Sequence, residues 1–240
     1  MYQENKLFGK TVIFNGDSIC AGSERRGSWA TRIAPRNQLA ACKNYAIGGG
    51  TIAEHTKPHL SGAARHSVSA TLDKMYEEFP NADYIVLEGG TNDADLLGRI
   101  TEGEIAARFG KVDPDDYSGN YDRDTFCGAL ESIFYRATRY WKGKKIAFIV
   151  AHKMGLKPPS AKNRRAYFDA AIEICKKWGI PYLDLWNTCY LNPALPWMYD
   201  PNISPDENMA GDSLYSDGQH LTPRGYELTA DIIDSFLKTL

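Results

Sequence analysis

Short runs of hydrophobic residues alternate along the chain with longer segments in which hydrophobic residues recur every three or four positions. Five of the short runs predict β-strands, over residues 11–15, 43–47, 83–89, 145–151 and 181–186. The third and fourth runs are almost continuously hydrophobic, which is typical of parallel strands with both faces covered. Strands that alternate with helices predict a parallel sheet joined by crossover helices. For a chain of 240 residues, this pattern favours one α/β domain over residues 1–240.

The longer segments have the period of amphipathic helices, with their hydrophobic residues on one face. Such stripes run through residues 72–79, 126–141, 170–178 and 232–240. Two other segments, roughly 94–121 and 187–219, are too long to be simple connections in a compact domain. Loops of this length usually contribute to a site or cover it.

Composition and charge exclude several classes of protein. The net charge is -2 and the pI is near 6.2, so no basic field would attract nucleic acid. No hydrophobic run approaches the roughly 20 residues of a membrane span, and the chain does not open on a signal peptide. We therefore expect a cytoplasmic protein, unless a leader has been removed. The five cysteines are widely spaced without a CxxC pair, so neither a zinc site nor a disulfide framework is predicted.

Polar residues that could take part in a reaction directly follow the predicted strands. In parallel α/β sheets, ligands bind beyond the carboxyl ends of the strands. The sequence "GDS" at residues 16–18 follows the first strand, and Gly16 permits the tight bend that would expose Ser18. A second "GDS" at residues 211–213 has no strand before it, so we interpret Ser213 as a turn residue.

A serine becomes a nucleophile when a base removes its proton and an acid orients that base. Asp217 and His220 lie three residues apart, so one turn can bring them together. Donors for the negative oxygen of a tetrahedral intermediate are available in Asn92, after the third strand, and in the three glycines 48–50, after the second. Each feature alone also fits an ordinary turn or loop, but together they occur in the order Ser, Gly, Asn, Asp-x-x-His.

This ordered set resembles the SGNH (GDSL) hydrolase superfamily. Its four blocks match "GDSICAG", "NYAIGGGT", "GGTND" and "DGQHLTPRGY", which begin at residues 16, 44, 89 and 217. The resemblance implies a three-layer α/β/α sandwich with a five-stranded parallel sheet in flavodoxin-like order. Glu88, at the end of an otherwise apolar strand, is unusual; it pairs with a nearby cation or reaches the site.

The resemblance also assigns roles to the matched residues. Ser18 is the expected nucleophile, His220 the base and Asp217 the acid that orients it. The oxyanion donors are expected to be the N–H groups of Ser18 and Gly49 and the side chain of Asn92. Asp17 is expected to hold the turn, and neither a metal nor a cofactor is needed.

The substrate is less well defined, because the superfamily includes carbohydrate acetylesterases, lysophospholipases, lipases and thioesterases. Aromatic residues in the long segment before Asp217, among them Trp186, Trp197 and Tyr199, suit stacking on sugars, although they could equally anchor the loop to the core. We predict an esterase that removes a short acyl group, most simply acetyl, from a carbohydrate or other small molecule. The oligomeric state is not predicted.

Three alternatives stay open at this stage. The first is a thioesterase or lysophospholipase of the same fold, and the second is a carbohydrate-binding module that has lost catalysis. The third is a metal site formed by His55, His59 and His66. Pro58 interrupts the helix that would align the first two histidines, so we do not favour the metal site.

Overall fold

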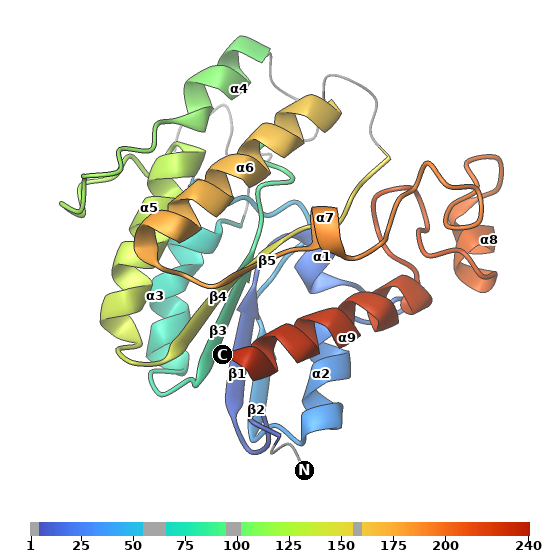
Figure 1. The fold of residues 1–240 in the computed structure, drawn as a ribbon, viewed down its shortest axis with the longest axis horizontal. Coiled ribbons are helices and arrows are strands. Elements are labelled where there is room, and N and C mark those ends of the chain that lie inside the picture. Colours follow the sequence, from blue (N-terminus) through green and yellow to red (C-terminus); the bar gives the residue numbers. More distant parts are fainter. Residues whose placement is uncertain (1–4, 55–65, 95–101, 156–159) are drawn as a thin grey trace.

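A parallel β-sheet forms the centre of the molecule (Figure 1). The computed structural model describes residues 5–54, 66–94, 102–155 and 160–240. The strands of this part of the chain are β1 (Thr11–Asn15), β2 (Ala41–Asn44), β3 (Tyr84–Glu88), β4 (Lys145–Val150) and β5 (Tyr182–Asp184). Their spatial order is β2-β1-β3-β4-β5 and every neighbouring pair is parallel. The predicted flavodoxin-like order is confirmed.

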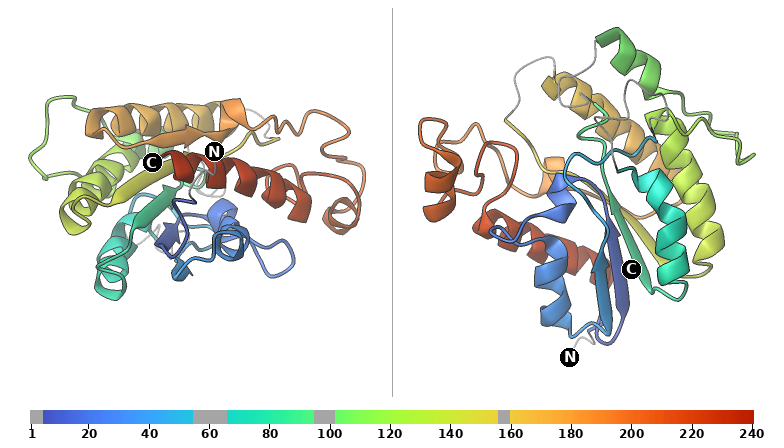
Figure 2. Two further views of the ribbon diagram at one scale, coloured as in Figure 1. Left: turned by 60° about the horizontal axis from the view of Figure 1, so that its bottom comes forward. Right: turned by 180° about the vertical axis from the view of Figure 1, so that it is seen from behind.

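Helices cover both faces of the sheet (Figures 1 and 2). They are α1 (Ser18–Ala21), α2 (Trp29–Asn37), α3 (Val68–Glu78), α4 (Glu102–Phe109), α5 (Phe126–Tyr140), α6 (Ser160–Trp178), α7 (Leu185–Thr188), α8 (Pro205–Ala210) and α9 (Pro223–Thr239). Helices α3, α5 and α6 lie on one face, and α2 packs with α9 on the other. The predicted three-layer sandwich is confirmed. Of the helices in the described ranges, none is both long enough and apolar enough to span a membrane.

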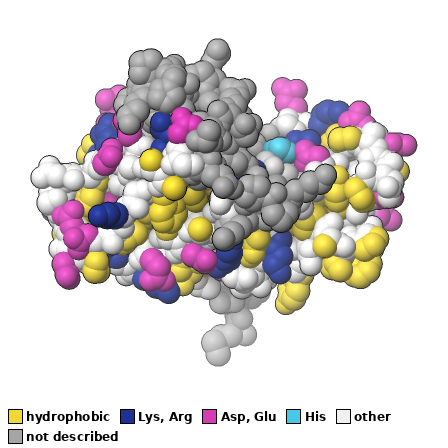
Figure 3. Space-filling model, turned by 90° about the horizontal axis from the view of Figure 1, so that it is seen from above, with side chains coloured by type: hydrophobic (Ala, Val, Ile, Leu, Met, Phe, Trp, Pro, Cys, Tyr) yellow, Lys and Arg dark blue, Asp and Glu magenta, His cyan; other side chains and the backbone are white. Residues whose placement is uncertain are grey.

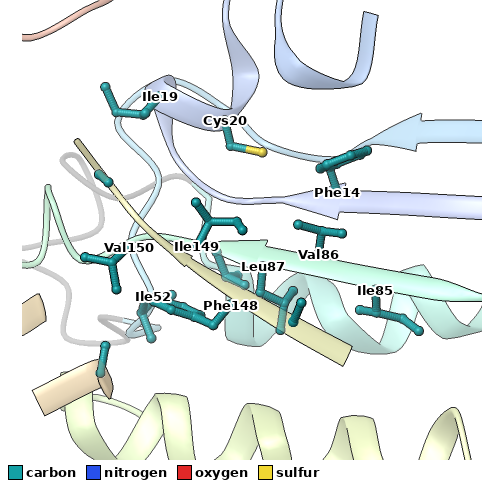
Figure 4. Close-up of a cluster of buried hydrophobic side chains, with 14 of the residues drawn as sticks. Phe14, Ile19, Cys20, Ile52, Ile85, Val86, Leu87, Phe148, Ile149 and Val150 are labelled. Carbon is teal, nitrogen blue, oxygen red and sulfur yellow. The ribbon is translucent and has the colours of Figure 1, made fainter. Parts of the chain in front are cut away.

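The central strands of the sheet are buried up to their carboxyl ends. All five residues of β3 are buried, and in β1 and β4 every residue but the first is buried. Figure 4 shows side chains of these three strands packed beneath Ile19 and Cys20 of α1. Full burial of a Phe, Leu or Ile side chain stabilises a fold by about 1.5–3 kcal/mol. The residues that follow β1 and β3 are therefore attached to a well-packed support.

Only the first predicted strand has the observed bounds; the third and fourth differ from β3 and β4 by one residue at one or both ends, and the second and fifth differ more. The second was predicted at residues 43–47, but β2 ends at Asn44 because the chain then turns across the end of β1, where the N–H of Ile47 donates to the carbonyl of Gly16 (3.3 Å). The fifth was predicted at residues 181–186, but Asp184 caps a short helix by accepting from the N–H of Asn187. A side-chain cap of this kind is a tertiary detail that a run of hydrophobic residues does not reveal.

The two long segments contain helices of their own. Helix α4 lies within the segment at 94–121, and α8 lies within the segment at 187–219, whose first two residues are the end of α7. Helix α6 begins ten residues before the stripe at 170–178 that predicted it, at Ser160. The stripes at 72–79, 126–141 and 232–240 all fall in observed helices.

Candidate active site

Ser18 is presented by a tight turn, which we call the Ser18 loop (residues 16–22), between β1 and α1. Asp17 caps α1, because its Oδ1 accepts from the N–H of Ile19 (2.8 Å). A Cβ at Gly16 would lie 2.6 Å from Glu88 Oε2 and 2.8 Å from Cys20 Cβ. Only glycine fits there, so the strand can turn within one residue and place Ser18, half-buried, at the first position of the helix.

The hydroxyl of Ser18 meets His220 from a distant part of the sequence. Ser18 Oγ lies 2.9 Å from His220 Nε2, although the two residues are 202 positions apart. His220 Nδ1 lies 2.8 Å from Asp217 Oδ2. The structure therefore brings together the three residues that the sequence singled out, in one continuous chain of hydrogen bonds.

Asp217 also shapes the turn that carries it, which we call the His220 loop (residues 216–220). Its Oδ1 accepts from the backbone N–H groups of Gln219 (3.0 Å) and His220 (2.7 Å). Burial raises the pKa of Asp217, but the hydrogen bonds from the side chain and backbone of His220 outweigh it and lower the pKa to about 2. Asp217 is therefore ionised at neutral pH and holds the Nδ1–H tautomer of His220, so that Nε2 can accept the hydroxyl proton.

The His220 loop is attached to the segment that follows β4. His152 Nε2 donates to the carbonyl of Gln219 (2.8 Å), and the N–H of Gly155 donates to the carbonyl of Gly218 (2.7 Å). Arg164 of α6 donates to the side-chain oxygen of Gln219 (3.1 Å). These contacts fix the backbone between Asp217 and His220.

His152 is a site-forming residue that the sequence reasoning missed. Its side chain is fully buried, and burial lowers its pKa to about 4, so the ring is neutral at physiological pH. It comes just after the fourth strand. The rule that ligand-binding residues follow the carboxyl ends of parallel strands had already led to Ser18 and Asn92. The same rule applied to the fourth strand would have found it.

Asn92 and the three-glycine segment lie beside Ser18. Asn92 Nδ2 donates to the carbonyl of Gly50 (2.8 Å), which uses one of its two amide hydrogens and orients the other. A Cβ at Gly48 would lie 3.9 Å from Ser18 Cβ, and Gly49 has a φ of +80°. No described residue accepts from the N–H of Ser18 or of Gly49. The predicted oxyanion donors thus include two backbone N–H groups without an acceptor in the described part of the chain.

Two more buried carboxyl groups adjoin the site. Asp93 accepts from the N–H groups of Ile52 (2.9 Å) and Ala53 (3.0 Å), and so holds the segment after the glycines. Burial raises the pKa of Asp93 to about 7. Glu88, which was noted as unusual in the sequence, accepts from the N–H of Asp17 (3.1 Å) and therefore reaches the site.

The three aromatic residues predicted to bind substrate lie in different environments. Trp186 packs edge-on against Phe168 of α6, with ring centroids 5.6 Å apart, as an anchor of its segment would. Trp197 is 69% exposed. Tyr199 touches the His220 loop, because a Cβ at Gly218 would lie 3.0 Å from its ring. Substrate binding by these residues stays a prediction; Tyr199 is the one for which the structure records a contact with the His220 loop.

The structure describes part of the two other sites considered from the sequence, the second "GDS" at Ser213 and the three histidines. Ser213 Oγ donates to Asn208 Oδ1 (2.7 Å), as expected of a turn residue. His55 and His59 lie outside the described residues. Nε2 of His66 lies 3.0 Å from Asn15 Oδ1, and among the described side chains there is no group of His, Cys, Asp or Glu that could hold a metal ion.

The carboxyl end of the sheet faces the viewer in Figure 3, where a histidine side chain reaches the surface beside acidic side chains. The side chains of His220 and Asp217 are 24% and 34% exposed. A substrate can therefore approach the hydrogen-bonded chain from solvent, while the groups behind Ser18 stay buried.

Ser18, His220 and Asp217 therefore lie together at the carboxyl end of a flavodoxin-like sheet, in an arrangement that can activate a serine hydroxyl group. The model of the GDSL-like Lipase/Acylhydrolase family matches residues 14–228. The chain belongs to this family. A search of curated protein sequences found no match.

Solved structures similar to this chain share its fold over almost the whole length. A protein from Lactobacillus plantarum has 21% identity and a TM-score of 0.70, covering 97% of this chain and 98% of its own. A lipase/acylhydrolase from Enterococcus faecalis has 19% identity and a TM-score of 0.58, covering 96% of each chain. A carbohydrate acetylesterase from Sinorhizobium meliloti has 14% identity and a TM-score of 0.61, covering 96% of this chain and 99% of its own.

Proposed function

We propose that this protein is a serine esterase that removes a short acyl group, most simply acetyl, from a carbohydrate. The observation that carries the proposal is the hydrogen-bonded chain from Ser18 through His220 to Asp217. It ends beside N–H groups for which the described residues provide no acceptor. A nucleophile, a base with its orienting acid and oxyanion donors are what ester hydrolysis requires.

In the first half of the reaction, Ser18 Oγ attacks the ester carbonyl while His220 Nε2 takes its proton. The carbonyl oxygen becomes an oxyanion that accepts from the N–H groups of Ser18 and Gly49 and from Asn92. The tetrahedral intermediate then collapses, the bond to the alcohol oxygen breaks, and His220 gives its proton to the leaving alcohol. Ser18 is left acylated.

In the second half, a water molecule takes the place of the alcohol. His220 removes a proton from the water as its oxygen attacks the acyl carbon. The bond to Ser18 Oγ breaks, the carboxylic acid leaves, and His220 returns the proton to the serine. Throughout, the ionised Asp217 stabilises the imidazolium form of His220.

The preference for a sugar substrate is supported by the exposed aromatic surface and by one fold relative. Tyr199 lies against Gly218 of the His220 loop, and Trp197 of the same segment is exposed; aromatic rings with exposed faces suit sugar stacking. The similar structure from Sinorhizobium meliloti is named a carbohydrate acetylesterase.

The complete set of contacts favours an enzyme over a binding module that has lost catalysis. In a module without hydrolysis, nothing would keep Ser18 within 2.9 Å of His220, and nothing would keep His220 within 2.8 Å of Asp217. A thioesterase or lysophospholipase would use the same residues, so acyl length must be measured.

The test is the hydrolysis of 4-nitrophenyl acetate, butyrate and octanoate, followed by acetylated xylo-oligosaccharides with acetate release as the readout. We expect the highest kcat/KM for the acetyl ester and release of acetate from the sugars. Preference for octanoate would favour a lipase or lysophospholipase. A folded wild type that hydrolyses none of these esters, nor an acyl thioester, would overturn the proposal in favour of a binding module.

A further inference from the structure

A pair of carboxyl groups is buried directly behind the Ser18 loop. Asp17 and Glu88 are both 0% exposed. Asp17 precedes Ser18, and Glu88 is the last residue of β3, the strand that pairs with β1. The reaction proposed above uses neither group, and burying two carboxyl groups together is costly unless they are needed there.

Burial acts on both carboxyl groups in the same direction. Neither Asp17 Oδ2 nor Glu88 Oε1 receives a hydrogen bond from a described N–H or hydroxyl group. Burial raises the pKa of both groups, and the neighbouring negative charge of Asp17 raises the pKa of Glu88 well above its usual value. The surroundings therefore favour the protonated form of Glu88.

Together the pair engages the backbone N–H groups on both sides of Ser18. Glu88 Oε2 accepts from the N–H of Asp17 (3.1 Å), and the Glu88 carboxyl also accepts from the N–H of Cys20. Asp17 Oδ1 accepts from the N–H of Ile19 (2.8 Å).

The rest of the loop is also paired, with one exception. The N–H groups of Ala21 and Gly22 donate to the carbonyls of Asp17 (2.9 Å) and Ser18 (3.1 Å). The N–H of Ser18 has no acceptor among the described residues. The pattern of bonds leaves one donor for an incoming oxyanion.

We propose that Glu88 is a positioning residue of this esterase: its side chain fixes the N–H groups flanking Ser18, and so aims the Ser18 N–H at the oxyanion. The inference rests on the proposed function, because the direction of this N–H affects catalysis only if Ser18 is acylated. Glu88 does not touch the substrate, since it is fully buried behind the loop.

Holding the proton on Glu88 also limits the negative charge behind the oxyanion. The ionisable groups around the pair are Cys20, Asp93, Arg164, His220 and Tyr226. With Glu88 neutral, the pair carries one negative charge, and Arg164 and His220 act on the Asp17 side. A second charge at Glu88 would repel the oxyanion that the loop is built to receive.

The inference predicts that shape and hydrogen bonding at residue 88 matter more than acidity. Glu88→Gln keeps the length, an acceptor for the N–H of Asp17 and a donor for its carboxylate, so kcat toward 4-nitrophenyl acetate should stay within about threefold of the wild type. Glu88→Asp keeps a carboxyl group but is one methylene shorter. Glu88→Met fills the space without any hydrogen bond.

We expect Glu88→Asp and Glu88→Met to lower kcat by about 10²-fold, the scale of a misdirected oxyanion donor, with KM little changed. The matched control is Glu131→Met on α5, because Glu131 is also buried, with Lys177 Nζ at 2.8 Å, but contacts no site residue. It should lose thermal stability without losing kcat.

Several outcomes would overturn the proposal. It fails if Glu88→Met keeps the kcat of Glu131→Met, or if Glu88→Asp is at least as active as Glu88→Gln. The comparison of Asp with Gln still decides the question if Glu88→Met does not fold. A wild type without esterase activity would overturn the proposed function itself. An active wild type with an inactive Ser18→Ala variant and unaffected Glu88 variants would overturn this inference alone.

Discussion

The Ser18 loop and the His220 loop meet at one hydrogen bond but are built in different ways. The Ser18 loop is a direct continuation of a central strand, and the carboxyl groups of Asp17 and Glu88 behind it are fully buried. The His220 loop connects irregular segments, and its Asp217 and His220 side chains are 34% and 24% exposed. The first loop is held by groups within and below it. The second is held by Asp217 within it and, from the side, by the segment after β4 and by α6.

For the proposed esterase, the difference would combine a fixed nucleophile with a solvent-accessible base in one site. An oxyanion donor must be aimed before the reaction, which favours a loop fixed in the core. A base must exchange protons with alcohol and water, which requires exposure. His152 and Arg164 hold the His220 loop from the side through hydrogen bonds to Gln219. Glu88 holds the Ser18 loop from below through the N–H of Asp17.

The largest effect is expected from removing the hydroxyl group of the Ser18 loop. Ser18→Ala should lower kcat toward 4-nitrophenyl acetate by about 10⁵-fold or more, because no other group can form the acyl intermediate. Ser213→Ala, in the second "GDS" sequence, is the matched control and should stay within about twofold. Circular dichroism confirms that both variants are folded. An inactive Ser213→Ala protein would show that the site has been misassigned.

The next largest effect belongs to the His220 loop. Asp217→Asn should lower kcat by about 10⁴-fold, because the amide favours the wrong tautomer of His220. Initial rates at pH 7 to 8 measure the loss. If activity were retained, Asp217 would only stabilise the turn of the His220 loop. That loop would then not supply an oriented base to the Ser18 loop.

Loss of an oxyanion donor should cost less than loss of the nucleophile or the acid. Asn92→Ala removes one donor and the hydrogen bond to Gly50, and we expect kcat to fall by about 10²–10³-fold with a smaller change in KM. Asn92→Asp tests the charge, since a carboxylate at that position would repel the oxyanion and should be no better than alanine. A rise in KM at constant kcat would instead indicate that Asn92 only binds the substrate.

A smaller effect should follow from loosening the His220 loop at its attachment to β4. His152→Phe removes the donor to Gln219 and should lower kcat by about 10–100-fold, the cost of a small displacement of the base. His152→Gln keeps an N–H at a similar position and should recover most of the activity. Equal losses in both variants would mean that the ring fills space and that its hydrogen bond is unimportant.

The smallest expected effect concerns stability and pH. Since the pKa of Asp217 is lowered to about 2 in the folded protein, its ionised form contributes stability above the unfolded value of about 3.9. That contribution is lost as the pH falls toward about 2. The Tm difference between the wild type and Asp217→Asn should therefore shrink between pH 5 and pH 2.5 in calorimetric scans. A constant difference would argue against ionisation of Asp217 as its cause.

The sequence predicted what depends on local pattern and on order along the chain. The strands followed from hydrophobic runs and their spatial order from the family resemblance. Ser18, Asn92 and His220 followed from their places in the sequence and from the family blocks. Contacts that depend on tertiary packing were not predicted. Glu88 appeared only as an unexplained carboxylate in an apolar strand, because its partner is backbone N–H of another strand's loop.

The position of His152 after the fourth strand could have singled it out, but nothing in the sequence reveals that its ring faces the carbonyl of Gln219, 67 residues away. The end of β2 was misplaced for a related reason, since the turn over Gly16 is formed by a tertiary hydrogen bond. Periodicity describes which residues face a core. It does not describe which polar atoms close a loop.

The central claim, that Ser18 is the nucleophile, can be tested most directly by covalent labelling. Diethyl 4-nitrophenyl phosphate transfers a diethylphosphoryl group to an activated serine and releases 4-nitrophenol, and peptide mass spectrometry locates the adduct. We predict one adduct per chain, on Ser18, that appears as esterase activity is lost and is absent from Ser18→Ala. An adduct on Ser213 or another residue that accompanies the loss of activity, with Ser18 unmodified, would contradict the account.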